Sequence, residues 1–301
     1  MSLLPHRHTG APLLYDGGMR THVNSVGLLV RADPAFLFVY PDHIPRDCID
    51  VLPQQPGIYI FRDEAATPIY IGKSVNIRQR VLSHLRTPEE AQMLARTRHI
   101  DFERTGGELG ALLREAMLIR EHQPVFNVKL RKQREMCSIA LREHRPEIVF
   151  AKEVDFGRTD GLFGLFGTKK AAQETLKNLV GAANLCSVAT GLEKGSPGRP
   201  CFARQIARCR GACIGEESAA DHGARLHAAL GHMLVRRWPY DGPIAIVEES
   251  DGLRQKQLVD NWCYLGTGKL KKKRAAARFD PAVYHILQRP LLAGGLAIEL
   301  L

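Results

Sequence analysis

The strongest constraint on the fold of this chain is a pair of short β-rich runs joined by a polar turn. GIYIF at 57–61 and IYIG at 69–72 are separated by RDEAATP, which is rich in polar and turn-forming residues. Two such runs across so short a turn predict an antiparallel β-hairpin. This hairpin is the reference point for the elements expected on either side of it.

The second run continues into Gly-Lys-Ser, which is how a phosphate-binding loop ends. That motif also needs a glycine five residues before its Gly-Lys pair, and Thr67 occupies this position. The residues in between, PIYI, favour an extended backbone rather than a loop that wraps around a phosphate. The sequence therefore excludes a nucleotide-binding loop at this point.

Periodicity and boundary signals place further elements. Apolar residues at i, i+4, i+5 and i+8 from Ile77 predict an amphipathic helix, with Ser74 as the expected N-cap. We expect a third strand at 99–104, a helix at 108–122 that Pro124 stops, and two more strands within 136–153. This mixture of helices and short strands predicts an α/β fold.

Composition indicates an anionic partner and a reducing environment. The 301 residues carry a formal net charge of +10 with a pI near 9.4, which favours nucleic acid or, as the alternative, an acidic membrane surface. No run approaches the roughly 20 apolar residues of a membrane span, so we expect no membrane insertion. Seven cysteines, an odd number without export signals, argue against a disulfide framework. We therefore expect a cytoplasmic protein.

Glu115 is the candidate metal ligand. On the predicted helix its neighbours at i±3 and i±4 are all apolar: Ala111, Leu112, Leu118 and Ile119. Burying an unpaired carboxylate is costly, so such a group either protonates or meets a cation from elsewhere. Mg²⁺ or Mn²⁺ is one such cation, because carboxylates are natural ligands of these ions. The alternative is a carboxylate at the edge of the apolar stripe that reaches water.

Two tyrosines and two cations are further candidates. Tyr59 and Tyr70 lie on the two strands of the predicted hairpin, each two residues from a glycine, and Lys73 follows the second strand. A phenol with a pKa of about 10 acts as a base near neutral pH only where positive charge lowers that pKa. Lys73, and Arg80 on the following helix, can supply such charge. The alternatives are ordinary strand aromatics and solvated surface cations.

These residues occur in the order of a known signature. G-I-Y at 57–59 and Y-I-G at 70–72 are followed by Lys73, Arg80, E-A-M-L-I at 115–119 and, after Q-P-V-F, Asn127. In this respect the chain resembles the GIY-YIG nuclease family over roughly residues 53–130. The resemblance implies a small, mainly antiparallel three-stranded sheet flanked by helices. It also implies metal-dependent hydrolysis of a phosphodiester bond.

The resemblance implies a role for each residue of the signature. Glu115 would be the protein ligand of the divalent metal, and Tyr70 or Tyr59 would accept the proton of the attacking water. Lys73 would tune that phenol. Arg80 would neutralise the scissile phosphate, and Asn127 would position the site by hydrogen bonding.

One position departs from the pattern of the family. Many UvrC proteins have a tyrosine where this chain has His84. The role of this position is therefore left open.

Two later segments extend the resemblance beyond the nuclease domain. FGLFGTKKAAQETLKNL at 163–179 and RPCFARQIARCRGACIG at 199–215 are similar to segments that follow this domain in the UvrC excinuclease subunit. We expect no second nuclease domain, paired helix-hairpin-helix motifs or UvrB-binding hairpin. The chain thus most resembles the short UvrC-like endonucleases of nucleotide excision repair.

The resemblance implies four parts. They are an N-terminal extension (1–44), a GIY-YIG nuclease domain (45–135), a UvrC-like α+β region with a cysteine cluster (136–240) and a C-terminal α+β segment (241–301).

Four of the cysteines form a second candidate site. Cys186, Cys201, Cys209 and Cys213 are separated by 14, 7 and 3 residues, whereas Cys48, Cys137 and Cys263 stand apart. Four thiolates suit a tetrahedral zinc ion or an iron–sulfur cluster, and buried cysteines without a ligand are the alternative. The absence of a C-x2-C pair argues against a zinc ribbon. The resemblance to UvrC favours a [4Fe–4S] cluster.

A basic run near the C-terminus is a candidate DNA-binding surface. KLKKKRAAAR at 269–278 contributes Lys269, Lys271, Lys272, Lys273 and Arg274. Such a run can follow a phosphate backbone and give salt-sensitive binding. A solvated loop that aids solubility is the alternative.

The resemblance predicts a DNA repair endonuclease that makes the 3′ incision near a lesion. We expect a monomer that acts on damaged duplex DNA in a UvrB–DNA complex. The alternatives are another GIY-YIG nuclease, of structure-specific or homing type, and a catalytically silent DNA-binding adaptor. The complete set of signature residues counts against the adaptor, because binding alone requires no metal carboxylate.

Overall fold

The computed structural model describes residues 40–128, 136–196, 198–270 and 277–301. By its internal contacts the chain divides into Met1–Tyr40 and Pro41–Leu301, and the helices and strands of the described residues lie in the second unit. The predicted N-terminal extension (1–44) lies almost wholly outside the described residues. In the part of the chain that is described, no helix is both long enough and apolar enough to cross a membrane.

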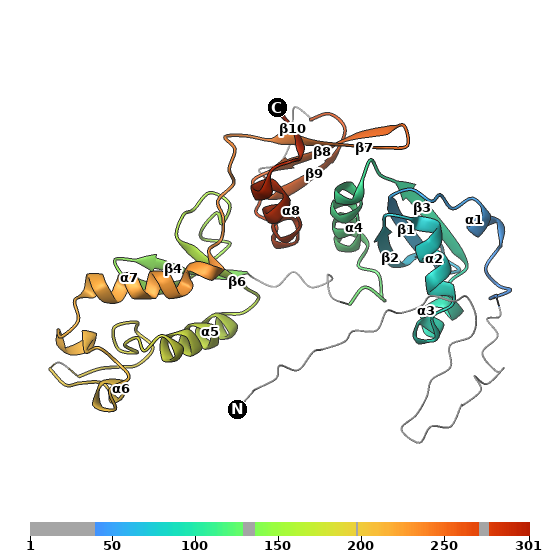
Figure 1. The fold of residues 1–301 in the computed structure, drawn as a ribbon. Coiled ribbons are helices and arrows are strands. Elements are labelled where there is room, and N and C mark those ends of the chain that lie inside the picture. Colours follow the sequence, from blue (N-terminus) through green and yellow to red (C-terminus); the bar gives the residue numbers. More distant parts are fainter. Residues whose placement is uncertain (1–39, 129–135, 197, 271–276) are drawn as a thin grey trace, which may run out of the picture. The chain divides into compact units, whose positions relative to one another are not determined.

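The predicted hairpin and third strand are confirmed, and they form a three-stranded antiparallel sheet in the order β2-β1-β3 (Figure 1). The strands are β1 (Gly57–Arg62), β2 (Pro68–Ser74) and β3 (His99–Arg104). Tyr59 lies opposite Gly72 and Phe61 opposite Tyr70, so these residues share one face of the sheet. The isoleucines of the other face belong to a core with residues of α4.

The elements around this sheet are α1 (Asp47–Asp50), α2 (Ile77–Leu85), the 3₁₀ helix η2 (Pro88–Glu90), α3 (Ala91–Arg96) and α4 (Glu108–His122). The N-cap of α2 is Asn76, whose side chain accepts a hydrogen bond from the Gln79 N–H (2.9 Å). Our prediction of Ser74 as this cap is wrong. Ser74 ends β2, and its hydroxyl donates to the Asn76 carbonyl (2.8 Å).

α4 is apolar on two sides and contributes to two cores. Leu118 and Ile119 pack with the isoleucines of the three-stranded sheet, whereas Leu113 packs in the core of the C-terminal elements. A helix that is apolar around most of its circumference is typical of a buried position. Gln123 adopts a left-handed conformation (φ 49°) and ends the helix just before Pro124.

A second three-stranded antiparallel sheet follows, in the order β5-β4-β6. Its strands are β4 (Cys137–Arg142), β5 (Arg145–Phe150) and β6 (Leu162–Phe166). The helices of this region are α5 (Lys169–Ala182), α6 (Phe202–Gln205), η3 (Ala212–Ile214), α7 (Ala219–Leu230) and η4 (Gly231–Met233). Leu176 of α5 and Leu226 of α7 pack with Ile139 and Phe163 in one core.

The C-terminal elements form a four-stranded sheet in the order β10-β7-β8-β9, with helix α8. Their bounds are β7 (Ile244–Ser250), β8 (Leu253–Asp260), β9 (Cys263–Thr267), α8 (Pro281–Ala293) and β10 (Ala297–Leu300). Trp262 and Tyr284 form the aromatic centre of this core, with ring centroids 4.9 Å apart. The predicted α/β class is confirmed, and the division at residues 44, 135 and 240 stays a prediction.

Candidate active site and cysteine cluster

Aromatic rings gather on one face of the β1–β2 hairpin. Ring centroids lie 6.3 Å apart for Tyr59 and Tyr70, 5.3 Å for Tyr59 and His84, and 5.4 Å for Tyr70 and His84. Gly72 permits this arrangement, because a Cβ there would lie 2.3 Å from the Tyr59 hydroxyl. The glycine of the second strand therefore makes room for the Tyr59 ring.

A buried chain of hydrogen bonds joins Tyr59 to Glu90. The Tyr59 hydroxyl lies 2.7 Å from His84 Nε2, and His84 Nδ1 is bonded to the Glu90 carboxylate. His84 is 2% exposed, and this burial lowers its pKa below the ordinary value, while Glu90 acts in the opposite direction. A neutral His84 with its proton on Nδ1 accepts a hydrogen bond from the Tyr59 hydroxyl at Nε2.

Arg80 of α2 lies beside the same hydroxyl. Burial raises the pKa of Tyr59, and a hydrogen bond with Arg80 acts to lower it. The same contact raises the pKa of Arg80. Burial also raises the pKa of Tyr70, and the charge of Arg80 acts to lower it. Arg80 is thus the cation that acts on both phenols.

Glu115 reaches from α4 to the end of β2. Its carboxyl is half-buried, and burial raises its pKa, while the charge and the backbone N–H of Lys73 act to lower it. The charge of Glu115 in turn raises the pKa of Tyr70, so the carboxylate lies within electrostatic reach of that phenol. The ammonium of Lys73 bonds to Glu108 (2.6 Å). The tuning of a tyrosine by Lys73 stays a prediction.

Asn127 closes the free edge of β2. Its side chain accepts a hydrogen bond from the Ile71 N–H (2.9 Å) and donates one to the Ile71 carbonyl (2.8 Å). The Phe126 N–H donates to the Ile69 carbonyl (3.0 Å). β2 is an edge strand, whose backbone groups would otherwise lack partners. Asn127 therefore holds the strand that carries Tyr70.

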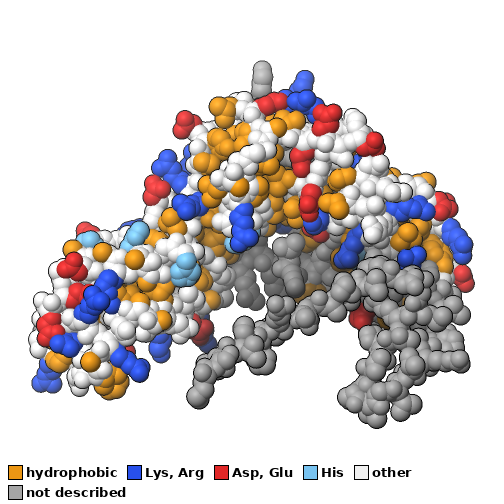
Figure 2. Space-filling model, in the orientation of Figure 1, with side chains coloured by type: hydrophobic (Ala, Val, Ile, Leu, Met, Phe, Trp, Pro, Cys, Tyr) orange, Lys and Arg blue, Asp and Glu red, His pale blue; other side chains and the backbone are white. Residues whose placement is uncertain are grey.

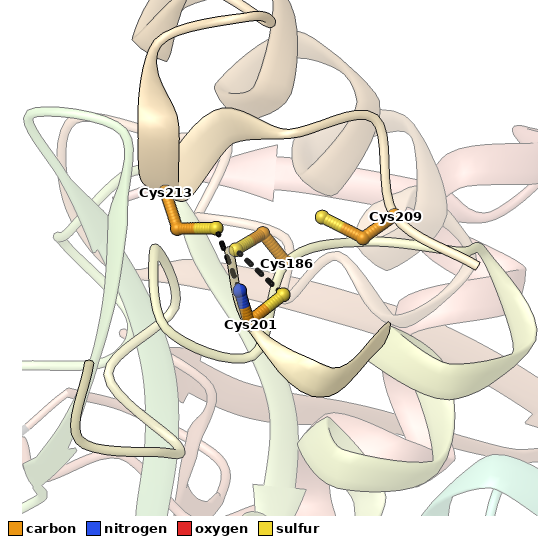
Figure 3. Close-up of side chains that lie close together, drawn as sticks. All are labelled: Cys186, Cys201, Cys209 and Cys213. Carbon is orange, nitrogen blue, oxygen red and sulfur yellow. Dashed lines mark hydrogen bonds between the residues drawn. The ribbon is translucent and has the colours of Figure 1, made fainter. Parts of the chain in front are cut away.

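The four predicted cysteines lie together (Figure 3). The sulfur atoms of Cys186, Cys201, Cys209 and Cys213 lie within 4.8 Å of one another, and those of Cys186 and Cys201 are 3.9 Å apart. Burial raises the pKa of Cys201 to about 12. Several thiolates in this volume would therefore need a compensating cation.

His222 of α7 is hydrogen-bonded to the backbone of the cysteine cluster. It is 2% exposed, and its Nε2 accepts a hydrogen bond from the Cys186 backbone N–H (3.0 Å). This bond ties the loop that carries Cys186 to the helix that follows the cluster. Sequence reasoning missed His222, because the contact joins residues 36 positions apart in the chain.

The predicted basic surface is only partly described. Lys269 is exposed, whereas Lys271, Lys272, Lys273 and Arg274 lie outside the described residues. On the face shown in Figure 2, Lys and Arg side chains are spread over the surface rather than gathered in one patch. A single lysine is therefore expected to contribute only a small part of any binding to DNA.

Sequence reasoning did not give a role to His84 and missed Glu90. A signal for His84 was available, because it belongs to the same helical stripe as Ile77, Val81 and Leu85, all of which are buried. No comparable signal marks Glu90. It lies on the turn η2 and meets His84 only through the folding of the chain.

Three families match consecutive parts of the chain. Residues 55–128 match the UvrC-like GIY-YIG domain, residues 136–232 the middle domain of UvrC/Cho excinuclease, and residues 243–301 the excinuclease Cho C-terminal domain. The GIY-YIG match covers the hairpin, His84, Glu115 and Asn127. The cysteine cluster lies within the match to the middle domain.

Relatives match most of the chain. Excinuclease cho of Escherichia coli O6:H1 strain CFT073 is 46% identical over 272 residues, which cover 88% of this chain and 92% of the relative. Excinuclease cho of Escherichia coli strain K12 is 45% identical over the same shares. UvrABC system protein C of Dictyoglomus thermophilum is 35% identical over 55% of this chain and 28% of that protein.

A solved structure resembles the nuclease part. It is the GIY-YIG N-terminal endonuclease domain of UvrC from Thermotoga maritima, bound to magnesium as its catalytic divalent cation. The domain is 32% identical and covers 28% of this chain and 94% of its own, with a TM-score of 0.26. The family assignment depends instead on the relatives that span nearly the whole chain: this protein belongs to the Cho family of UvrC-like excinucleases and is a DNA endonuclease of nucleotide excision repair.

Proposed function

We propose that this excinuclease makes the 3′ incision near a lesion by metal-dependent hydrolysis of one phosphodiester bond. It acts as a monomer in the cytoplasm, on damaged duplex DNA in a UvrB–DNA complex. The observation that carries the proposal is that Tyr70 lies beside Tyr59 and His84, with ring centroids 6.3 and 5.4 Å away. The charges of Arg80 and of the half-buried Glu115 both act on the pKa of this phenol. A metal ligand, a proton acceptor and a cation are what this hydrolysis requires.

Glu115 would hold the divalent metal, Mg²⁺ or Mn²⁺. Its carboxyl fits this role because burial raises its pKa, which means that its charge is only partly compensated. Oxygen ligands are also those that these ions prefer. The ammonium of Lys73 bonds to Glu108 (2.6 Å) rather than to Glu115. A bound metal supplies Lewis-acid stabilisation of the negative charge that develops at the phosphate.

Tyr70, Tyr59 and His84 form a path for the proton of the attacking water. Tyr70 is half-buried whereas Tyr59 is 1% exposed, so Tyr70 is the phenol that water can reach. As Tyr70 accepts the proton, its own proton passes to the Tyr59 oxygen and that of Tyr59 passes to His84 Nε2, since hydroxyl protons can rotate. Glu90 then stabilises the imidazolium at Nδ1.

Arg80 and Asn127 complete the proposed site. Arg80 is exposed and faces both phenols, so it can neutralise the scissile phosphate where the base acts. Asn127 positions Tyr70 through its two hydrogen bonds to Ile71, the next residue of β2.

Substitution at the metal ligand and at the cation tests the proposal. Glu115→Ala or Arg80→Ala is expected to abolish metal-dependent nicking of a lesion-bearing duplex and to leave the fold intact. Glu121→Ala is the matched control, because Glu121 is an exposed carboxylate on the same helix. If the Glu115 or Arg80 variant nicked at the wild-type rate, the assignment would be wrong.

We also propose that the four cysteines hold a metal centre as thiolates. The site fits such a group because the four sulfurs lie within 4.8 Å of one another and three of the cysteines are buried. The resemblance to UvrC favours a [4Fe–4S] cluster. The sulfur spacing, by contrast, suits a single zinc ion, for which Zn–S bonds of about 2.3 Å place the sulfurs roughly 3.8 Å apart.

Metal analysis of protein purified without exposure to air decides between these groups. Iron together with absorbance near about 400 nm identifies the cluster. One zinc per chain identifies the single ion. Protein that is folded but contains neither metal would overturn the proposal.

A further inference from the structure

The helix that carries Glu115 has no cap from its own neighbours. α4 follows Gly107, which has an extended backbone (φ 179°) and no side chain to accept the free N–H groups of the first turn. Glu248 of β7 takes this role. Its Oε1 accepts a hydrogen bond from the Leu109 N–H (2.9 Å) and its Oε2 one from the Gly110 N–H (2.6 Å). The cap of α4 therefore comes from a residue 139 positions beyond Leu109.

Glycines allow β7 and β8 to approach α4 this closely. A Cβ at Gly107 would lie 2.3 Å from Glu248 Oε1, and a Cβ at Gly110 would lie 2.4 Å from Gln257 Nε2 of β8. Neither glycine lies in the left-handed region of φ, since Gly107 is extended and Gly110 lies within the helix, so backbone freedom is not the reason for glycine here. What these positions need is the absence of a side chain.

Two further contacts attach α4 to the C-terminal elements. In its middle, Leu113 is fully buried in a core with residues of β7, β8 and α8. In its last turn, Arg120 forms an ion pair with Asp280, which is buried and is the N-cap of α8. α4 is thus attached at its start, its middle and its end to elements of residues 243–301.

We propose that residues 243–301 act as the positioning element of the nuclease, with Glu248 as the positioning residue that sets the start of α4 and thereby the place of Glu115. The inference rests on the proposed role of Glu115 as the metal ligand. Glu115 lies less than two helical turns beyond Gly110, so a displaced first turn would move its carboxylate. Reactions of this kind are sensitive to displacements of about 1 Å.

Glu248→Gln in the full-length chain tests the proposal without a change in side-chain size. An amide has one oxygen in place of two, so one N–H of α4 loses its acceptor and faces an NH₂ group. We expect the Mg²⁺ concentration for half-maximal nicking to rise about tenfold, as for loss of a group that orients a metal ligand. The rate at saturating Mg²⁺ should stay within about threefold of wild type. Glu249→Gln, an exposed neighbour on β7, is the control.

Hydrogen exchange of the Leu109 and Gly110 amides gives a readout that needs neither metal nor DNA. Loss of a helix cap predicts exchange that is about 3- to 30-fold faster in Glu248→Gln. Unchanged exchange, or faster exchange with an unchanged Mg²⁺ requirement, would overturn the positioning role. If Glu115→Gln nicks at the wild-type rate, it is instead the proposed function that fails, whatever the exchange result.

Gly110→Ala tests the close approach from the side of the helix. Alanine stabilises an ordinary helix interior relative to glycine, so a helix free of β8 would gain stability. In this protein the added methyl group would collide with Gln257, so we expect a lower Tm and a higher Mg²⁺ requirement. A higher Tm with nicking at the wild-type rate would overturn the proposal.

Discussion

The nuclease site and the cysteine cluster are assembled in different ways. Tyr59, Tyr70, Arg80 and Glu115 come from two strands and two helices of regular structure. The four cysteines come from one stretch between α5 and α7 in which the helices are only a turn long. Regular elements hold a site together without its ligand, whereas a site made of loops depends on the ligand for its order. Loss of metal should therefore impair chemistry at the first site and stability at the second.

The largest expected effect is on catalysis. Glu115→Gln should reduce nicking by about 10³-fold or more, because it removes the proposed metal ligand. Its Tm should be equal to or above that of wild type. Burial raises the pKa of the Glu115 carboxyl, so the fold disfavours the charge that the amide removes. Single-turnover nicking and thermal unfolding measure the two quantities. A marked drop in Tm would contradict the claim that the metal at the nuclease site serves chemistry rather than stability.

At the cysteine cluster we expect a large loss of stability and a small loss of nicking activity. Cys209→Ala should remove the metal centre and lower the Tm by roughly 5–10 °C, as for a loss of a few kcal/mol in a chain of this size. Nicking at a temperature where the variant is folded should fall far less than in Glu115→Gln. Cys263→Ala, outside the cluster, is the control and should retain the metal. Wild-type metal content in the Cys209 variant would contradict the proposed centre.

We expect His84 to make the nicking rate sensitive to pH. Burial lowers its pKa, so it is neutral above about pH 6.5 and accepts the Tyr59 proton. Its protonation at lower pH should close the path and reduce the nicking rate on the acid side. His84→Phe should lower the rate by about 10²-fold and remove this acid limb. An unchanged acid limb in the variant would exclude His84 as its cause.

The lowered pKa of His84 also predicts how the free energy of unfolding depends on pH. As the pH falls below about 6.5 the unfolded chain binds a proton at His84 that the folded chain does not. Wild-type stability should therefore decline from about pH 6.5 down to the lower folded-state pKa, and above pH 6.5 this contribution should be absent. Urea unfolding at about pH 5.5 and 7.5 measures the difference. In His84→Phe this part of the decline should disappear.

The smallest effect is expected at the basic surface. Lys269→Ala should weaken binding to DNA of any sequence and lower the slope of log K against log salt by about 0.9, as for one phosphate contact. Lys170→Ala, an exposed lysine of α5 that pairs with Glu174, is the control. An unchanged slope would indicate that Lys269 does not contact phosphate.

Local signals were sufficient to predict much of the fold. The third strand and the helix carrying Glu115 have the predicted bounds, because turn residues, apolar period and Pro124 all lie within a few residues of them. The predicted N-cap of α2 was wrong because Ser74 and Asn76 are both suitable N-cap residues. Ser74 belongs to the end of β2, which leaves Asn76 as the cap.

The candidate site was predictable only in part. Its signature residues lie in order along the chain, and the helical period of α2 marks His84 as buried. The partners that set its chemistry, Glu90 and Glu248, meet the site through tertiary contacts that no period or spacing reveals. α4 is apolar around most of its circumference, and this pattern already indicated that a second set of elements packs on the side of the helix away from the three-stranded sheet.

Mapping the incision on a duplex with one defined lesion, with and without UvrB and Mg²⁺, tests the central claim most directly. We predict a single nick on the 3′ side of the lesion that requires UvrB and the metal and is absent with Glu115→Gln. Nicking of undamaged DNA without UvrB, or a cut elsewhere that persists in Glu115→Gln, would contradict the account.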